Sequence, residues 1–244
     1  MSDSEIELEQ AHIDSAYRLL EQARTRAVEL RSMVEVGRGG TTQARYERDV
    51  IEESIQNRLG QLQLGSASLI FGRIDEESGE RFYIGRLAVA DEYQEPVVVD
   101  WRAPVAEPFY RATGRHPMGL VRRRHFVTRG KDLLNIEDEL FDLDQLDENY
   151  QGHGALLAAL DQNRDGQLRD IVATIQGEQD EIIRDSPKGM IIVQGGPGTG
   201  KTVVALHRAA YLLYTHRFPL EGQGVLVVGP NRLFLRYIEQ VLPS

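Results

Sequence analysis

Residues 190–202 read MIIVQGGPGTGKT, an apolar run that leads into a glycine-rich loop. From Gly195 to Thr202 the sequence matches G-x-x-x-x-G-K-[ST] at every fixed position. The glycines let successive backbone N–H groups turn inward toward phosphate oxygens. The positive end of the helix that follows the loop attracts the same anion. The stretch therefore predicts a strand, a phosphate-binding loop and a helix, and with them an α/β fold.

Each part of this loop has an expected role toward the cofactors ATP and Mg²⁺. Lys201 can reach the β- and γ-phosphates, and Thr202 can ligate Mg²⁺ beside the nucleotide. The rest of the predicted cofactor-binding loop consists of Gly195, Gly196, Pro197, Gly198, Thr199 and Gly200. A chance glycine turn is the less favoured interpretation, because an apolar strand pattern precedes the loop and a helical pattern follows it.

Hydrolysis of ATP needs more than this loop, since an acidic residue at the end of a second strand must help to hold Mg²⁺. The strand expected at residues 225–230 is followed by Asn231 and not by a carboxylate. We therefore expect no complete catalytic set in these 244 residues. By itself this chain is expected to bind nucleotide weakly and to show negligible turnover.

Residues 1–66 predict an antiparallel coiled-coil hairpin. Residues 4–36 contain no Gly or Pro, and a second helical pattern spans residues 43–64. Seven-residue spacing of apolar side chains predicts a helix–helix seam in the first helix. The seam consists of Ile6, Ile13, Leu20, Ala27 and Val34, with Ala16, Ala23 and Leu30 at an offset of three. Glu9 is the polar exception in this seam.

Residues 67–150 predict a small β-rich connector. The segments SLIFGRID (68–75) and RFYIGRLAV (81–89) have the pattern of a β-hairpin. The segments PVVVDWRAP, FYRAT and GLVRRRHFVT follow it as further β-rich pieces. Trp101 has apolar residues on both sides and is predicted to anchor the core. The acidic residues 136–149 are predicted to be partly helical.

Residues 151–244 predict a domain built around the phosphate-binding loop, and the resemblance given below implies that it is the first part of a RecA-like ATPase domain. A helix is expected over residues 170–184, strands over 190–194 and 225–230, and a parallel sheet built from these strands. His207 and Tyr211, on the helix after the loop, are expected to have no catalytic duty. The whole chain is thus expected to be an α/β protein with three parts.

The composition limits the classes of function. A formal net charge of −10 makes the protein a poor general ligand for the phosphate backbone of nucleic acids. The absence of cysteine excludes disulfides and Cys-ligated metal sites, and the six histidines show no metal-ligand spacing. No long apolar run or signal-peptide pattern occurs. We therefore expect a soluble, cytoplasmic protein.

The order of the motifs in the C-terminal part resembles that of UvrD/Rep-type superfamily 1 helicases. GEQDEIIR (177–184) precedes the loop, and VLVVGPN (225–231) follows it. The resemblance implies that Gln179 contacts the adenine base and that Arg184 also belongs to the cofactor-binding set. The segment around Pro230 and Asn231 looks like a motif that lies near single-stranded DNA in that family.

The N-terminal part resembles a narrower group. A helical hairpin, then FGRID, FYIGRLAV, DWRAPVAEPFYRAT and RRRHF, then the ATPase core, is similar to the HelD family. The amino-acid sequence of the hairpin resembles that of actinobacterial members, including the rifamycin-resistance branch called HelR. The resemblance implies RNA polymerase as partner, with the hairpin at residues 4–64 in its secondary channel, and nucleic-acid release and polymerase recycling as the function.

Several alternatives stay open. The hairpin could be scaffold within its own chain. The run Arg122–His125 could contact nucleic acid, although ion pairs with the acids near residues 137–139 are favoured. Residues 137–148 could mimic DNA, although a solvated helix is favoured. The chain could also belong to a genuine UvrD/Rep-type DNA helicase, or to a binding module with a vestigial loop.

Overall fold

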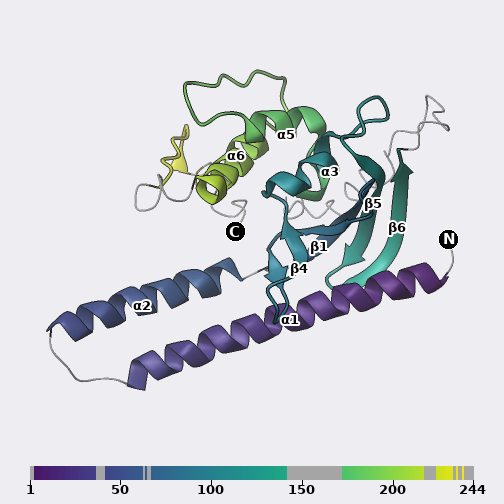
Figure 1. Cartoon of the computed structure of the whole chain (residues 1–244). Coiled ribbons are helices and arrows are strands. Elements are labelled where there is room, and N and C mark those ends of the chain that lie inside the picture. Colours follow the sequence, from purple (N-terminus) through teal and green to yellow (C-terminus); the bar gives the residue numbers. More distant parts are fainter. Residues whose placement is uncertain are drawn as a thin grey trace.

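The structure, a computed structural model, describes residues 3–36, 42–62, 64, 67–141, 172–216, 224–232, 235 and 238. Figure 1 shows a twisted sheet with helices on both faces. The long helix α1 (Asp3–Val36) crosses one face, and α3 (Glu107–Arg111), α5 (Gly177–Arg184) and α6 (Lys201–Thr215) lie on the other. The predicted α/β class is therefore confirmed. No helix in this described part is long and apolar enough to span a membrane.

The sheet has six strands in the order β3-β4-β2-β1-β5-β6. Their bounds are Ile70–Glu76 (β1), Arg81–Gly85 (β2), Val89–Ala90 (β3), Pro96–Asp100 (β4), Leu120–Arg129 (β5) and Asp132–Leu140 (β6). The pair β2–β4 is parallel and the other neighbouring pairs are antiparallel. The predicted hairpin of residues 68–89 is confirmed by the pairing of β1 with β2.

One core lies between the sheet and the helices α3, α5 and α6. Trp101, Phe109, Ile183 and Val204 belong to this single buried cluster. Trp101 is 2% exposed, so its predicted role as a core anchor is confirmed. Two short 3₁₀ helices, Pro104–Ala106 and Val172–Thr174, also contribute buried residues to this core. The sheet and the helix that follows the glycine-rich loop thus share one apolar interior.

A second core lies between the opposite face of the sheet and α1. Ile13, Ala16 and Leu20 of α1 are buried there with Ile70 and Val98 of the sheet. These three helix positions belong to the predicted seven-residue pattern. Their main partner in the first half of α1 is therefore the sheet, since a helix buries its apolar stripe against whichever surface covers it.

The same face of the sheet contains a buried ion cluster around Glu9. The Oε1 atom of Glu9 accepts hydrogen bonds from Arg73 and, at 2.7 Å, from Arg124 Nη1. The Oε2 atom accepts one from the Tyr83 hydroxyl at 2.9 Å. Asp75 pairs with Arg73 at 2.7 Å. The polar exception in the helical pattern is thus the residue that fixes α1 to β1, β2 and β5.

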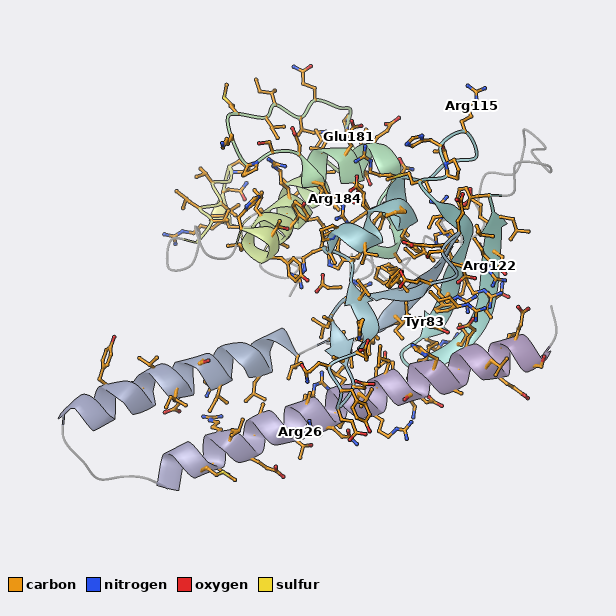
Figure 2. All side chains as sticks on the ribbon, in the orientation of Figure 1. Arg26, Tyr83, Arg115, Arg122, Glu181 and Arg184 are labelled. Atoms are coloured by element: carbon orange, nitrogen blue, oxygen red, sulfur yellow. The ribbon has the colours of Figure 1, made fainter. Side chains whose placement is uncertain are left out.

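The strand alternation of β5 explains the arginine run. Arg122 and Arg124 point toward α1, where they pair with Asp75 and Asp138. Arg123 points to the other face, where it pairs with Glu139 and donates to the Phe109 carbonyl at 3.0 Å. Opposite charges on neighbouring strands stabilise their pairing. The favoured prediction of ion pairs with nearby acids is confirmed, and Figure 2 shows Arg122 among these side chains on the sheet.

Two local predictions in this region were wrong. Residues 136–140, expected to be partly helical, belong to strand β6, where Asp138 and Glu139 lie opposite Arg124 and Arg123 of β5. Residues 109–111 of the segment FYRAT, expected to be β-rich, belong to helix α3 (Glu107–Arg111), which has a proline in its first turn. The remainder of the predicted acidic helix, residues 142–149, lies outside the described residues.

The strands predicted at residues 190–194 and 225–230 are not formed. Neither segment has strand structure or pairs with a strand in the part of the chain that the structure describes. Met190, Ile192, Leu226 and Val228 are exposed. An apolar run becomes a strand only when neighbouring strands satisfy its backbone and cover its side chains. The helix predicted over 170–184 is shorter, since α5 begins at Gly177.

The second helix, α2 (Thr42–Gln61), lies beside the distal part of α1 (Figure 1). Arg24 Nε donates to the Leu62 carbonyl at 2.9 Å, and Arg31 pairs with Glu52 at 3.8 Å. The two helices therefore run antiparallel, with later residues of α1 opposite earlier residues of α2. We call residues 24–36 together with α2 the arm.

The ion cluster predicts that the free energy of unfolding is sensitive to substitution of Glu9. Glu9→Leu would leave Arg73 and Arg124 without one of their buried carboxylate partners, and breaking a buried pair costs about 3–5 kcal/mol. We expect urea denaturation to show this loss. Glu7→Leu is the matched control on the same helix, because Glu7 is exposed, and it should change the free energy of unfolding by no more than about 0.5 kcal/mol. Equal effects of the two changes would contradict the role of the cluster.

The fold should also lose stability in mild acid. Burial, reinforced by the positive charge of Arg123, lowers the pKa of His125 to about 4 from the ordinary value of 6.5. The contribution is fully present above pH 6.5 and is lost as the pH falls toward 4, since the unfolded chain takes up the proton first. Burial lowers the pKa values of His12 and His207 in the same direction.

We expect His125 alone to remove roughly 2 kcal/mol from the free energy of unfolding between pH 7 and pH 5. His125→Phe should flatten this part of the pH dependence in urea titrations while keeping a ring against Phe109. Measurement of the variant at pH 8, where histidine is neutral in both states, gives the separate cost of altered packing. An unchanged pH slope in the variant would contradict the assignment.

Candidate nucleotide-binding site

The glycine loop, residues 195–200, leads directly into α6, a helix of 15 residues. Gly198 and Gly200 have φ angles of 80° and 83°, a region that side chains rarely adopt. A Cβ atom at Gly200 would lie 2.9 Å from Nε2 of Gln179. Glycine is therefore favoured at position 200 by the turn, whereas the nearby Gln179 amide is the end of a flexible side chain that can shift.

Lys201 lies over the glycine loop. Its Nζ atom donates to the carbonyl of Gly195 at 2.9 Å and to that of Gly196 at 2.5 Å. Thr199 Oγ1 also donates to the Gly196 carbonyl, at 3.0 Å. The ammonium group is thus held beside the N-terminal end of α6, where the partial positive charge of a helix lies. Two independent sources of positive charge converge on one short loop, and this donor set fits a phosphate group.

Gln179 connects the glycine loop to helix α5. Its Oε1 atom accepts from the backbone N–H of Gln176 at 3.2 Å and so caps the start of α5. Its Nε2 atom lies 3.5 Å from the Thr199 carbonyl. The structure therefore brings the upstream glutamine and the loop together, although 20 residues separate Gln179 from Thr199. Pro197 is exposed in the turn, and Thr202 is partly buried in the first turn of α6.

Arg184, the other upstream residue of the predicted set, lies away from the loop. Its Nη2 atom donates to the Trp101 carbonyl at 2.6 Å, and its Nε donates to Asp180 at 2.9 Å. Asp180 is fully buried, and burial raises its pKa, while Arg184 acts in the opposite direction. The side chain of Arg184 is thus directed at the turn after β4 (Figure 2).

Arg208 is a functional candidate that the sequence did not reveal. Its guanidinium donates to the carbonyls of Ile182, Ile183, Asp185 and Ser186, at 2.7–3.2 Å. These are carbonyls at the C-terminal end of α5, where a helix lacks its own donors. A single arginine on an amphipathic helix gave no signal, because its partners are more than 20 residues away.

The other two residues considered near the site, His207 and Tyr211, pack against neighbouring side chains. His207 is buried against Trp101, with a ring-centroid distance of 5.6 Å, and its Nδ1 lies 2.8 Å from the Val203 carbonyl. Tyr211 packs beside the guanidinium of Arg184. Among the described residues, no cluster of histidine and carboxylate side chains could by itself hold a metal ion.

The fold and this site define a sheet domain with a docked two-helix arm, joined through a shared core to a loop and helix suited to phosphate. Residues 6–154, more than half of the chain, match the family described as DNA helicase IV HelD, N-terminal domain. The chain therefore belongs to this family. A comparison with curated proteins found no match.

The contacts of Arg208 give a testable prediction about α5. Arg208→Ala would remove the donor from four carbonyls, and charge-assisted hydrogen bonds of this kind contribute about 1.5–3 kcal/mol. We expect a loss of that order in thermal or urea unfolding. Arg115→Ala is the control, because Arg115 is exposed at the tip of a loop (Figure 2) and should leave stability unchanged. Equal stability of both variants would show that α5 is held by other contacts.

Proposed function

We propose that this chain is the N-terminal part of an ATP-dependent, helicase-like factor that binds RNA polymerase. In this proposal the arm enters the secondary channel of the polymerase, and the factor helps to release nucleic acid and recycle the enzyme. The family match and the resemblance to HelD-type factors support the proposal. ATP with Mg²⁺ is the proposed cofactor, bound at the glycine loop.

The observation that carries the proposal is the way the arm leaves the body. Helix α1 is continuous from the Glu9 cluster to Val36, so the half that packs on the sheet and the half that extends beyond it are one element (Figure 1). A continuous helix of this kind keeps its direction and can present its far end at a fixed position. The arm is therefore supported by the whole sheet.

The surface of the arm also suits a protein partner. Large apolar side chains are exposed on both of its helices, namely Val28, Leu30 and Met33 on α1 and Tyr46, Val50 and Ile51 on α2. Met33 and Tyr46 are each about seven-tenths exposed. Exposed apolar side chains grouped on one element mark interaction surfaces more often than isolated ones do.

The chain's own residues have distinct proposed roles toward the nucleotide. Lys201 and the N-terminus of α6 would bind phosphate groups, and Thr202 would hold Mg²⁺ there. Gln179 would orient the adenine base from the side of α5. When bound, the nucleotide supplies a phosphoanhydride bond whose hydrolysis can drive release of the factor from its partner.

The arm proposal is tested by shortening the arm without touching the core. Deletion of residues 1–66 is unsuitable, because Ile13, Ala16 and Leu20 belong to the core against the sheet. Arg31 and Glu52 face each other, so residues 31–52 can be replaced by a short Gly-Ser loop. We expect the shortened chain to fold normally and to lose capture of purified core RNA polymerase by at least about tenfold, or about 1.4 kcal/mol.

Two controls separate the alternatives. Lys201→Ala should keep polymerase capture and lose nucleotide binding, since the lysine lies far from the arm in sequence and its ammonium group donates to carbonyls of the loop. Capture of polymerase by the shortened chain at the wild-type level would contradict the proposal. Binding of single-stranded DNA without any binding of polymerase would favour a DNA helicase instead, with an affinity that falls steeply with salt.

A further inference from the structure

Arg184 occupies the centre of the contacts between α5 and the rest of the chain. Its Nη2 donates to the Trp101 carbonyl at 2.6 Å, and its Nη1 lies 3.3 Å and 3.2 Å from the carbonyls of Arg102 and Ala103. The guanidinium also lies 5.3 Å from the ring centre of Tyr211 and 5.9 Å from that of Tyr110. One side chain of α5 thus touches the turn after β4, α3 and α6.

These contacts use most of the hydrogen-bond donors of the guanidinium. An arginine has five N–H donors in a fixed fork. The Nε donor is used by both Asp180 oxygens, at 2.9 Å and 3.1 Å, and Nη1 and Nη2 are used by three successive carbonyls. The side chain is 6% exposed. A direct contact between Arg184 and a phosphate would draw the guanidinium away from these partners, of which Asp180 and Trp101 are buried.

Gln179 and Arg184 belong to the same short helix but face different neighbours. Five residues of α-helix correspond to a rotation of about 140° between the two side chains. Gln179 faces Thr199 and Gly200 of the glycine loop, whereas Arg184 faces residues 101–103. Because α5 has only eight residues, any tilt at the Arg184 end displaces the Gln179 end.

We propose that Arg184 is a positioning residue that makes the turn at residues 101–103 a support for the base side of the nucleotide site. By clamping α5 onto this turn, Arg184 holds the Gln179 amide at the glycine loop and so sets the preference for adenine. The sheet domain thereby controls which base the site accepts. This inference rests on the proposed binding of ATP at the glycine loop.

The test uses fluorescent ATP and GTP analogues and inorganic tripolyphosphate with the full chain. Arg184→Lys keeps the charge but can satisfy fewer of the carbonyls. We expect it to reduce the preference for ATP over GTP by at least about fivefold, while tripolyphosphate affinity stays within about twofold of wild type. Arg111→Lys is the matched control, because Arg111 pairs with Glu107 at the surface of α3 and should keep the wild-type preference.

A double-mutant cycle shows whether Arg184 acts through Gln179. If it does, Gln179→Ala abolishes the base preference, and adding Arg184→Lys changes nothing further, because the effects of coupled residues are not additive. Additive losses, or an unchanged preference in Arg184→Lys, would overturn the inference. A fall in tripolyphosphate affinity parallel to that of ATP would also overturn it, because Arg184 would then contact phosphate.

A second variant guards against general misfolding. Asp180→Asn leaves all carbonyl partners of Arg184 in place but weakens the pair that orients its guanidinium, so a smaller loss of base preference is expected. If Arg184→Lys fails to fold and Asp180→Asn keeps the full preference, the inference is rejected. Failure of the wild-type chain to bind any nucleotide would instead reject the proposed cofactor, which the tripolyphosphate titration reports separately.

Discussion

The arrangement of the molecule depends on the contacts that the buried Glu9 carboxylate makes. Together with Asp75 and Asp138 it faces the guanidinium groups of Arg73, Arg122 and Arg124 between α1 and the sheet. A buried ion cluster adds little net stability compared with apolar packing, but it is costly to break or to shift. A slide of α1 would take Glu9 away from Arg73 and Arg124, whereas the pairs that Asp75 and Asp138 make lie within the sheet. The cluster therefore fixes where α1 lies, and with it the direction of the arm.

On the opposite face of the sheet, packed side chains and arginine hydrogen bonds connect the sheet to α5 and α6, the helices beside the glycine loop. Phe109 of α3 packs so closely on β1 that a Cβ at Gly72 would lie 2.3 Å from its ring. Arg184 then ties α5 to the turn after β4, and Arg208 ties the end of α5 to α6. Arm, sheet and loop are thus connected through packed side chains at every step.

The sequence predicted those parts of the fold that depend on neighbouring residues. The β1–β2 hairpin, the burial of Trp101 and the glycine loop followed by a helix all follow local patterns, and the structure contains each of them. Strand β6 was missed because its acids suggested a solvated helix, whereas their partners lie on β5. The strands expected at 190–194 and 225–230 failed for a related reason, since local apolar character supplies no pairing partner. The contacts of Arg184 with residues 101–103 and the role of Arg208 were not predicted, because their acceptors are distant carbonyls, which leave no side-chain pattern.

We expect the arm, the sheet and α6 to move as one rigid body, because α1 continues from the sheet into the arm and α6 shares a core with the sheet. The chain has no cysteine, so two can be introduced for spin labels, at Arg26 on the arm and at Ala205 on α6, both exposed. The distance distribution between the two labels, measured by pulsed electron paramagnetic resonance, tests the claim most directly. A single narrow distribution, unchanged in width when nucleotide is added, is the predicted result. A broad distribution or two separate populations would show a hinge between the arm and the loop and would contradict the account.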